Sequence, residues 1–245
     1  VCRGIHGRYV LLALAWSVGP WLLGGAWALP INTQGAFVSP EGSGRATALV
    51  AAPSAPHIVY AGFDNGFVIR SIDGGRSFGP VYGNLPGNFI PLTLVVHPSD
   101  CNLVLVGGYR ATNQASGFYA EIYGSTDGGR IWTLRYTSMT PLGPQYAYQA
   151  VRVIRFDPAN PSIVLAGLMI DRIRDDVYFS RQGPMLRSVN GGEYWETVPQ
   201  SEFSSSVYTG ILSAVLFDIA RPGRVLAGFG GGYLYNRHGL YESLD

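Results

Sequence analysis

One pattern of residues occurs three times in this chain and begins a fourth time, and it limits the possible folds more than any other feature. The segments RSIDGGRSF (70–78), GSTDGGRIW (124–132) and RSVNGGEYW (187–195) share the form Ser-x-(Asp/Asn)-Gly-Gly-x-x-aromatic. The segment YESLD (241–245) matches the first half of that form. Internal repetition of this kind indicates a fold that is built from repeated structural units.

Two further segments precede each of these boxes in the same order. The nearer one is a short apolar run such as NLVLVGG (102–108) or SIVLAGL (162–168), and before it comes an apolar run that ends in a proline-rich turn, such as LTLVVHPSD (92–100). Each unit therefore has the order strand, turn, strand, variable loop, strand, Gly-Gly turn, strand. No amphipathic helical stretch separates these runs, which argues against a parallel α/β fold.

Four short strands in a unit of this size are the signature of a β-propeller blade. The serines that open successive boxes are 54, 63 and 55 residues apart. We therefore predict an all-β chain: a β-propeller of four-stranded antiparallel blades, with three complete blades and a truncated fourth. Because YESLD lacks the Gly-Gly pair and the returning strand, we expect these 245 residues to be a fragment of a larger propeller.

The composition agrees with an all-β chain and excludes one class of partner. Glycine (33 residues), proline (16 residues) and aromatic residues (13%) are abundant, as expected for many short strands and turns. The formal net charge is +1 and no stripe of basic residues occurs, so we expect no nucleic-acid partner.

The first residues have the features of a secretion signal. Arg3 and Arg8 precede a long apolar run that ends in Ala26-Trp27-Ala28, which has the A-x-A form of a signal-peptidase site. We predict a signal peptide over 1–28, a linker over 29–44 and the propeller over 45–245. The chain would then be an exported bacterial protein, periplasmic or extracellular, with no membrane span after cleavage. The alternative is an uncleaved membrane anchor over 9–29, because the apolar run is almost long enough to span a bilayer.

The boxes have the chemistry of tight turns. A short Asp or Asn side chain can accept hydrogen bonds from backbone N–H groups ahead of it, and glycine pairs supply the positive φ angles that such turns need. We assign these residues a structural role rather than catalysis or calcium binding, because Asn190 can replace an aspartate in a turn but not as a general acid. The structural set is Ser71, Asp73, Gly75, Phe78, Ser125, Asp127, Gly129, Trp132, Ser188, Asn190, Gly192, Trp195, Ser243 and Asp245.

The Ser-x-Asp-Gly-Gly-x-x-Trp boxes resemble the Asp-box, or BNR, repeats of sialidase-like β-propellers, and the resemblance covers about residues 45–245. That superfamily includes bacterial sialidases, xyloglucan-cleaving endoglucanases, sortilin-type receptors and photosystem II assembly factors. The resemblance implies the propeller fold. It does not imply one activity, because the same scaffold serves hydrolases, receptors and assembly factors.

A site is expected on one face of the propeller. The turns between strands 1 and 2 and between strands 3 and 4 of each blade are short, and we call their side the Asp-box face. The other connections are long and form the opposite side, which we call the loop face; long loops on a rigid scaffold are where function usually lies. These segments are 108–119, 136–150, 168–184, 199–212 and 230–239.

The loop face is rich in tyrosine and arginine. These side chains can stack on sugar rings and hydrogen-bond to hydroxyl groups, and they are also enriched at protein interfaces. The alternative is that the tyrosines pack between blades and the charges form solvated pairs; for Arg45, a salt bridge at the start of a strand is that alternative. The candidate ligand-binding residues are Arg45, Tyr109, Arg110, Tyr146, Tyr148, Arg172, Arg174, Tyr178, Tyr208 and Tyr233.

Catalysis is an open question at this point. A glycosidase needs two carboxyl groups about 5–10 Å apart across the scissile bond. Weak candidates on the loop face are Asp171, Asp175, Asp176 and Glu202, none of which has a supporting local motif. No zinc or phosphate-loop spacing occurs, so we expect no metal and no cofactor.

We therefore expect an exported Asp-box propeller that binds a glycan or a protein ligand on its loop face. Glycoside hydrolysis of the sialidase or xyloglucanase kind is the enzymatic form of this hypothesis. A non-enzymatic scaffold or assembly factor is the alternative, and no oligomeric state is predicted.

Overall fold

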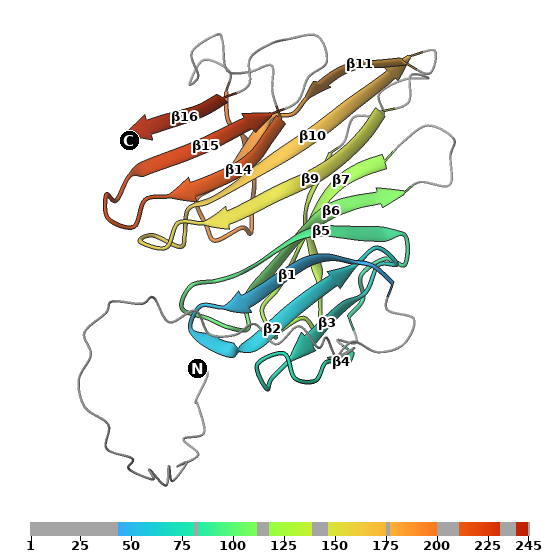
Figure 1. Ribbon diagram of the computed structural model, residues 1–245, viewed down its shortest axis with the longest axis vertical. Coiled ribbons are helices and arrows are strands. Elements are labelled where there is room, and N and C mark those ends of the chain that lie inside the picture. Colours follow the sequence, from blue (N-terminus) through green and yellow to red (C-terminus); the bar gives the residue numbers. More distant parts are fainter. Residues whose placement is uncertain are drawn as a thin grey trace, which may run out of the picture.

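The fold is known from a computed structural model, which describes residues 44–80, 83–111, 118–138, 147–174, 177–199, 211–230 and 239–244. Within these residues the chain is entirely β, and no helix is long and apolar enough to cross a membrane. Figure 1 shows four antiparallel sheets arranged as an open arc. The predicted all-β propeller is confirmed, including its incomplete ring.

The first two sheets are simple four-stranded meanders, in which each strand pairs with the next along the chain. Blade 1 consists of β1 (Ala46–Ala52), β2 (Ala55–Phe63), β3 (Val68–Ser71) and β4 (Gly79–Pro80). Blade 2 consists of β5 (Phe89–Val96), β6 (Val104–Ala111), β7 (Phe118–Ser125) and β8 (Thr133–Thr137).

The other two sheets follow the same order with one addition. Blade 3 consists of β9 (Ala147–Phe156), β10 (Val164–Arg174), β11 (Val177–Gln182), β12 (Met185–Ser188) and β13 (Glu196–Thr197). Blade 4 has three described strands, β14 (Ile211–Phe217), β15 (Arg224–Gly230) and β16 (Gly239–Leu244). Three blades are therefore complete, and the fourth lacks an outer strand among the described residues.

The additional strand corrects one expectation. The segment 168–184 was expected to be a long loop, but β10 continues to Arg174 and pairs with β11 as a hairpin. The segment is rich in Ile, Val, Tyr and Phe, whose strand preference extends the sheet beyond the core. Gly183 lies between β11 and β12, where a Cβ would be only 1.6 Å from the carbonyl oxygen of Leu168. Only glycine fits this close approach of two backbones.

The core lies between neighbouring blades. One cluster joins blades 1 and 2 and contains Tyr60, Phe89 and Trp132; a second joins blades 2 and 3 and contains Leu105 and Trp195. The box aromatics of blades 2 and 3 thus pack against the preceding blade. A third cluster joins blades 3 and 4. Stability of the arc therefore depends on contacts between repeats rather than within them.

A glycine in the second strand of each blade makes this packing possible. A Cβ at Gly107 would lie 2.7 Å from Val151 of the next blade, and one at Gly167 would lie 2.5 Å from the carbonyl oxygen of Leu212. Gly62 is crowded in the same way by the blade that follows it. The recurring glycine therefore marks where the first strand of the next blade crosses.

Contacts join the first strands of the four blades, β1, β5, β9 and β14, each to the next. We call them the inner strands. Each has a β-bulge just before the residue that pairs with the recurring glycine. The residues at these bulges are Thr47, Leu92, Arg152 and Ser213.

The Asp boxes are tight turns on the opposite face from the long loops. In the first box the Ser71 hydroxyl oxygen accepts from the N–H of Gly75 (2.8 Å), and Asp73 Oδ1 accepts from the N–H groups of Arg76 and Ser77 (3.0 and 2.9 Å). Gly74 has a φ of +79°. Hydrogen bonds, led by the one from the Ser77 side chain, hold the pKa of Asp73 well below its usual range.

The other boxes repeat this geometry. Asp127 Oδ1 accepts from the N–H of Ile131 at 2.9 Å, and Asn190 Oδ1 accepts from the N–H of Tyr194 at 3.0 Å. Since an amide oxygen fills the position in the third box, the turn requires an acceptor oxygen and not a charge. In the fourth box, Ser243 of β16 pairs with Val225 of β15, whereas Asp245 lies outside the described residues.

A candidate ligand-binding site on the loop face

Three aromatic rings meet where blades 2 and 3 reach the loop face. Tyr109 lies near the end of β6, Phe118 begins β7 and Tyr148 lies near the start of β9. The ring centroids are 5.3 Å apart for Tyr109 and Phe118, 4.9 Å for Tyr109 and Tyr148, and 5.1 Å for Phe118 and Tyr148. All three pairs are edge-to-face, so the rings support one another in a fixed arrangement. We call them the aromatic triangle.

The triangle stands on a small apolar cluster. Tyr109 and Tyr148 pack against Ala150, Met169 and Ile211, which are buried and come from blades 3 and 4. Phe118 is 36% exposed, and the two tyrosines are partly exposed. The triangle is therefore held by three blades and still presents aromatic surface at the loop face.

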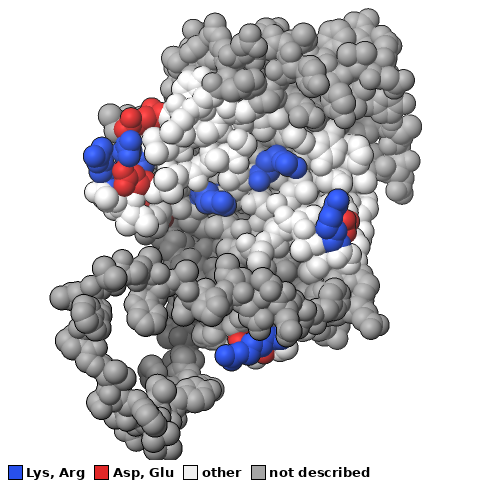
Figure 2. Space-filling view, in the orientation of Figure 1, with Lys and Arg blue, Asp and Glu red and all other residues white. Residues whose placement is uncertain are grey.

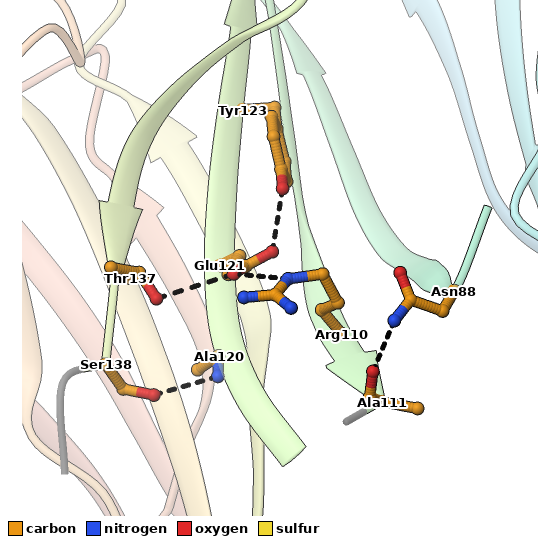
Figure 3. Close-up of polar contacts among 8 residues, drawn as sticks. All are labelled: Asn88, Arg110, Ala111, Ala120, Glu121, Tyr123, Thr137 and Ser138. Carbon is orange, nitrogen blue, oxygen red and sulfur yellow. Dashed lines mark hydrogen bonds and ion pairs between the residues drawn. The ribbon is translucent and has the colours of Figure 1, made fainter. Parts of the chain in front are cut away.

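Arg110 and Glu121 form a charged pair on the other side of β6 and β7 from Tyr109. Arg110 follows Tyr109 in β6, so its side chain points to the opposite side of the sheet. Its Nε donates to Glu121 Oε1 at 2.8 Å (Figure 3). Its guanidinium also lies 5.2 Å from the ring centroid of Tyr119. The Arg110 side chain is 32% exposed. It thus remains partly open to solvent while one edge is fixed by a carboxylate.

Glu121 is completely buried and fully engaged. Its Oε2 accepts from the Tyr123 hydroxyl at 2.8 Å, and the Thr137 hydroxyl lies 3.5 Å from Oε1 (Figure 3). Burial and the bond to Glu121 raise the pKa of Tyr123. Burial acts to lower the pKa of Arg110, but the hydrogen bond and charge of Glu121 outweigh it and raise the pKa. Glu121 therefore orients Arg110 and is not a carboxyl group that a ligand can reach.

The candidate residues from the sequence divide into three groups. Tyr109 and Tyr148 come together in the triangle, whereas Arg110 lies on the other side of β6 with Glu121. Arg45 is 83% exposed and its Nε lies 3.3 Å from Asp64 Oδ2, which is the salt-bridged alternative considered for it. The others have no described side chains: Asp171, Arg172, Arg174 and Tyr178 lie in the β10–β11 hairpin, and Tyr146, Asp175, Asp176, Glu202, Tyr208 and Tyr233 lie outside the described residues.

Two residues of this site were missed in the sequence. Phe118 and Glu121 both lie in β7. Glu121 falls outside the predicted loop segments, and Phe118 lies in the segment 108–119, where only tyrosine and arginine were selected as candidates. The alternation Tyr119, Glu121, Tyr123 is the signal that could have placed an acid on the same side of the sheet as two tyrosines. Among the residues that the structure describes, no group of three His, Cys, Asp or Glu side chains could hold a metal ion.

These features define a β-propeller fold: antiparallel four-stranded blades, with turns of the Asp-box form on one face and long connections on the other. Comparison with solved structures agrees at the level of the fold. The chain is similar to a GH74 xyloglucanase from Xanthomonas campestris (16% identity, TM-score 0.54), covering 80% of this chain and 27% of the other. It is also similar to an ancestral GH74 enzyme (24% identity, TM-score 0.56), covering 86% of this chain and 24% of the other.

A third similar structure is the GH93 α-L-arabinofuranosidase of Fusarium graminearum in complex with arabinobiose, at 14% identity and a TM-score of 0.52. That match covers 85% of this chain and 66% of the other. The chain thus spans only about a quarter of the GH74 enzymes. No protein-family model matches the chain. No curated protein is significantly similar to it in sequence.

Proposed function

We propose that this chain belongs to an exported propeller that binds a glycan on its loop face, centred on the aromatic triangle. The observation that carries the proposal is the triangle itself, which places three rings at the strand ends of two blades with Phe118 open to solvent. Pyranose rings present apolar C–H faces that can stack on exposed aromatic rings of this kind.

The similar structures include two enzymes that act on glycans. The GH74 protein from Xanthomonas is a xyloglucanase, and the Fusarium enzyme is an arabinofuranosidase that was solved with arabinobiose. At these identities the likeness concerns the fold, so the residues of the triangle carry the argument for this chain.

Binding is better supported than hydrolysis. A glycosidase needs a carboxylic acid that can reach the glycosidic oxygen. Glu121, the acid on the same strand as Phe118, is buried and already bonded to Arg110 and Tyr123. We therefore propose a binding role for this part of the propeller; hydrolysis would depend on acids such as Asp175 or Glu202, which lie outside the described residues.

The experiment is a titration of the full chain with neutral xyloglucan and arabinan oligosaccharides, measured by calorimetry. Phe118→Ala should weaken binding about five- to thirty-fold, because an aromatic ring that stacks on a ligand contributes about 1–2 kcal/mol. Phe67→Ala is the matched control, since Phe67 is 60% exposed and lies away from the triangle, on the β2–β3 connection of blade 1. It should change affinity less than two-fold. Equal effects of the two variants, or no binding by any glycan of the panel, would refute the proposal.

Export is tested separately. The proposal requires cleavage after Ala28, so the mature protein recovered from a bacterial host should begin at Leu29 and should lie outside the cytoplasm. A chain that keeps 1–28 and sediments with the membrane would support the anchor over 9–29 instead.

A further inference from the structure

The inner strands are nearly free of charge. Across 46–52, 89–96, 147–156 and 211–217 the charged residues are Arg152 and Arg155, both on β9 and both exposed. Figure 2 shows two separate blue patches, with no red beside them, over the position that β9 occupies in Figure 1. The wall formed by the inner strands is therefore otherwise uncharged, with a short positive strip in its third strand.

The bulge explains why Arg152 is exposed, and a comparison of the blades shows that the bulge does not need an arginine. In blades 1 and 4 the bulge residue is Thr47 or Ser213, and its hydroxyl donates to the carbonyl of the recurring glycine, Gly62 or Gly228, at 3.1 Å. In blade 2 it is Leu92, which packs on the apolar cluster under the triangle.

Arg152 has neither of these structural roles. Bulges re-aim a side chain, and this one turns the guanidinium of Arg152 outward between Val151 and Val153, both of which are buried in the interfaces. No ion pair joins Arg152 or Arg155 to an acid among the described residues. Arg155 Nη1 donates to the carbonyl oxygen of Ile154 at 2.8 Å, which leaves most of its donors open. Two guanidinium groups that have no acidic partner within the described part of the chain, on an otherwise uncharged wall, form a site for anions.

We propose that Arg152 and Arg155 bind the acidic groups of a linear, uronic-acid-containing polysaccharide along the inner wall. The two residues are three positions apart on a strand, so their Cα atoms are separated by roughly 10 Å. This spacing suits an extended polymer with repeated charges better than a single small anion.

A polysaccharide fits the surroundings better than another polyanion. Tyr148 of the aromatic triangle lies on the same strand, four residues before Arg152, so stacking and charge recognition would follow one line from the loop face along β9. The inference rests on the proposed glycan binding and names the class of glycan.

The test is a titration of the full chain with oligogalacturonate, with a neutral xyloglucan oligosaccharide as the uncharged comparison. Arg152→Gln should weaken oligogalacturonate binding about five-fold, as expected for one exposed charge-assisted contact, and Arg155→Gln should do the same. Arg152→Lys should retain most of the affinity because it keeps the charge. Raising the salt concentration should weaken binding of the wild type and should affect the double variant less.

Arg130→Gln is the matched control. Arg130 is exposed on the Asp-box face, so this variant removes the same charge from the chain at another place. It should leave the affinity unchanged within two-fold, and an equal loss would show that only net charge matters and would overturn the site. Urea midpoints within error of the wild type would show that all variants remain folded, which their exposed side chains predict.

Two further probes test the class of ligand. A poly-glutamate peptide and an oligo-dT strand carry repeated charges without sugar acids, and we expect both to bind more weakly than oligogalacturonate. Tighter binding of either one through the same arginines would overturn the polysaccharide assignment. Loss of neutral-glycan binding in Phe118→Ala but not in Arg152→Gln would separate a failure of this inference from a failure of the proposed function.

Discussion

Replacing Glu121 by alanine should lower the free energy of unfolding by about 3 kcal/mol. The carboxylate is completely buried and accepts from Arg110 Nε and the Tyr123 hydroxyl, both at 2.8 Å. Without it the Tyr123 hydroxyl is left buried without an acceptor, at a cost of about 1–3 kcal/mol. Removing one partner of a buried ion pair costs about 3–5 kcal/mol, but Arg110 is 32% exposed and can be rehydrated, so its share falls to about 1 kcal/mol.

Two variants separate the contribution of the Glu121 charge to this loss of stability from that of the Tyr123 hydroxyl. Glu121→Gln keeps the shape and an acceptor oxygen but removes the charge, so it should cost about 1–2 kcal/mol. Tyr123→Phe removes only the hydroxyl and should cost about 1 kcal/mol. The two changes should not add, because they act on one hydrogen-bond network.

The assay is urea unfolding at pH 7, followed by the fluorescence of tryptophan. Trp132 is a suitable reporter because it is buried in the same interface between blades 1 and 2 as Tyr123. A loss below about 0.5 kcal/mol for Glu121→Ala would refute the reasoning, since a surface substitution causes no more than that. Equal stability of Glu121→Gln and the wild type would show that the charge contributes nothing.

Two further predictions concern the turns and the packing between blades. Burial acts to raise the pKa of Asp127, but hydrogen bonds led by the one from Ile131 outweigh burial and lower the pKa. The Asp127 carboxylate therefore stabilises the fold at pH values above its ordinary pKa, and this contribution is lost as the pH falls through the lowered pKa. Asp127→Asn, which copies Asn190, should therefore reduce the drop in urea midpoint between pH 7 and pH 2, whereas an unchanged drop would contradict this account. Gly167→Ala should destabilise the chain by about 2–3 kcal/mol, because its Cβ would lie 2.5 Å from a backbone oxygen. Gly228→Ala, whose Cβ would meet nothing closer than 3.4 Å, should change stability by less than about 1 kcal/mol in the same measurement, and similar losses for both variants would be inconsistent with the packing described.

The fold could be predicted because its signals are local and repeated. A Ser-x-Asp-Gly-Gly turn contains both its acceptors and the glycines that its backbone angles need within nine residues. The hairpin between β10 and β11 was missed because loop length was given more weight than the strand preference of residues such as Ile173 and Tyr178. In both cases the outcome depends on residues that are neighbours in the sequence.

The candidate site could be predicted only in part. Tyr109 and Arg110 stood out because they flank a long connection, and Tyr148 because it lies in another. The contacts that decide their roles join distant segments. The ring of Tyr109 in blade 2 contacts that of Tyr148 in blade 3, and Arg110 in β6 donates a hydrogen bond to Glu121 in β7. Nothing in the local sequence of either partner specifies the other.

The sequence by itself determined the fold class of this protein. A blade needs only short strands, tight turns between them and glycines at fixed positions, and all three repeat along the chain. The tertiary structure decided which side chains are available. Glu121 and Arg152 are both charged residues within strands, yet one is buried against an arginine and the other is turned out of the wall by a bulge. The difference arises from packing between blades and from the register of one strand pair, which are properties of the assembled sheet and not of either segment.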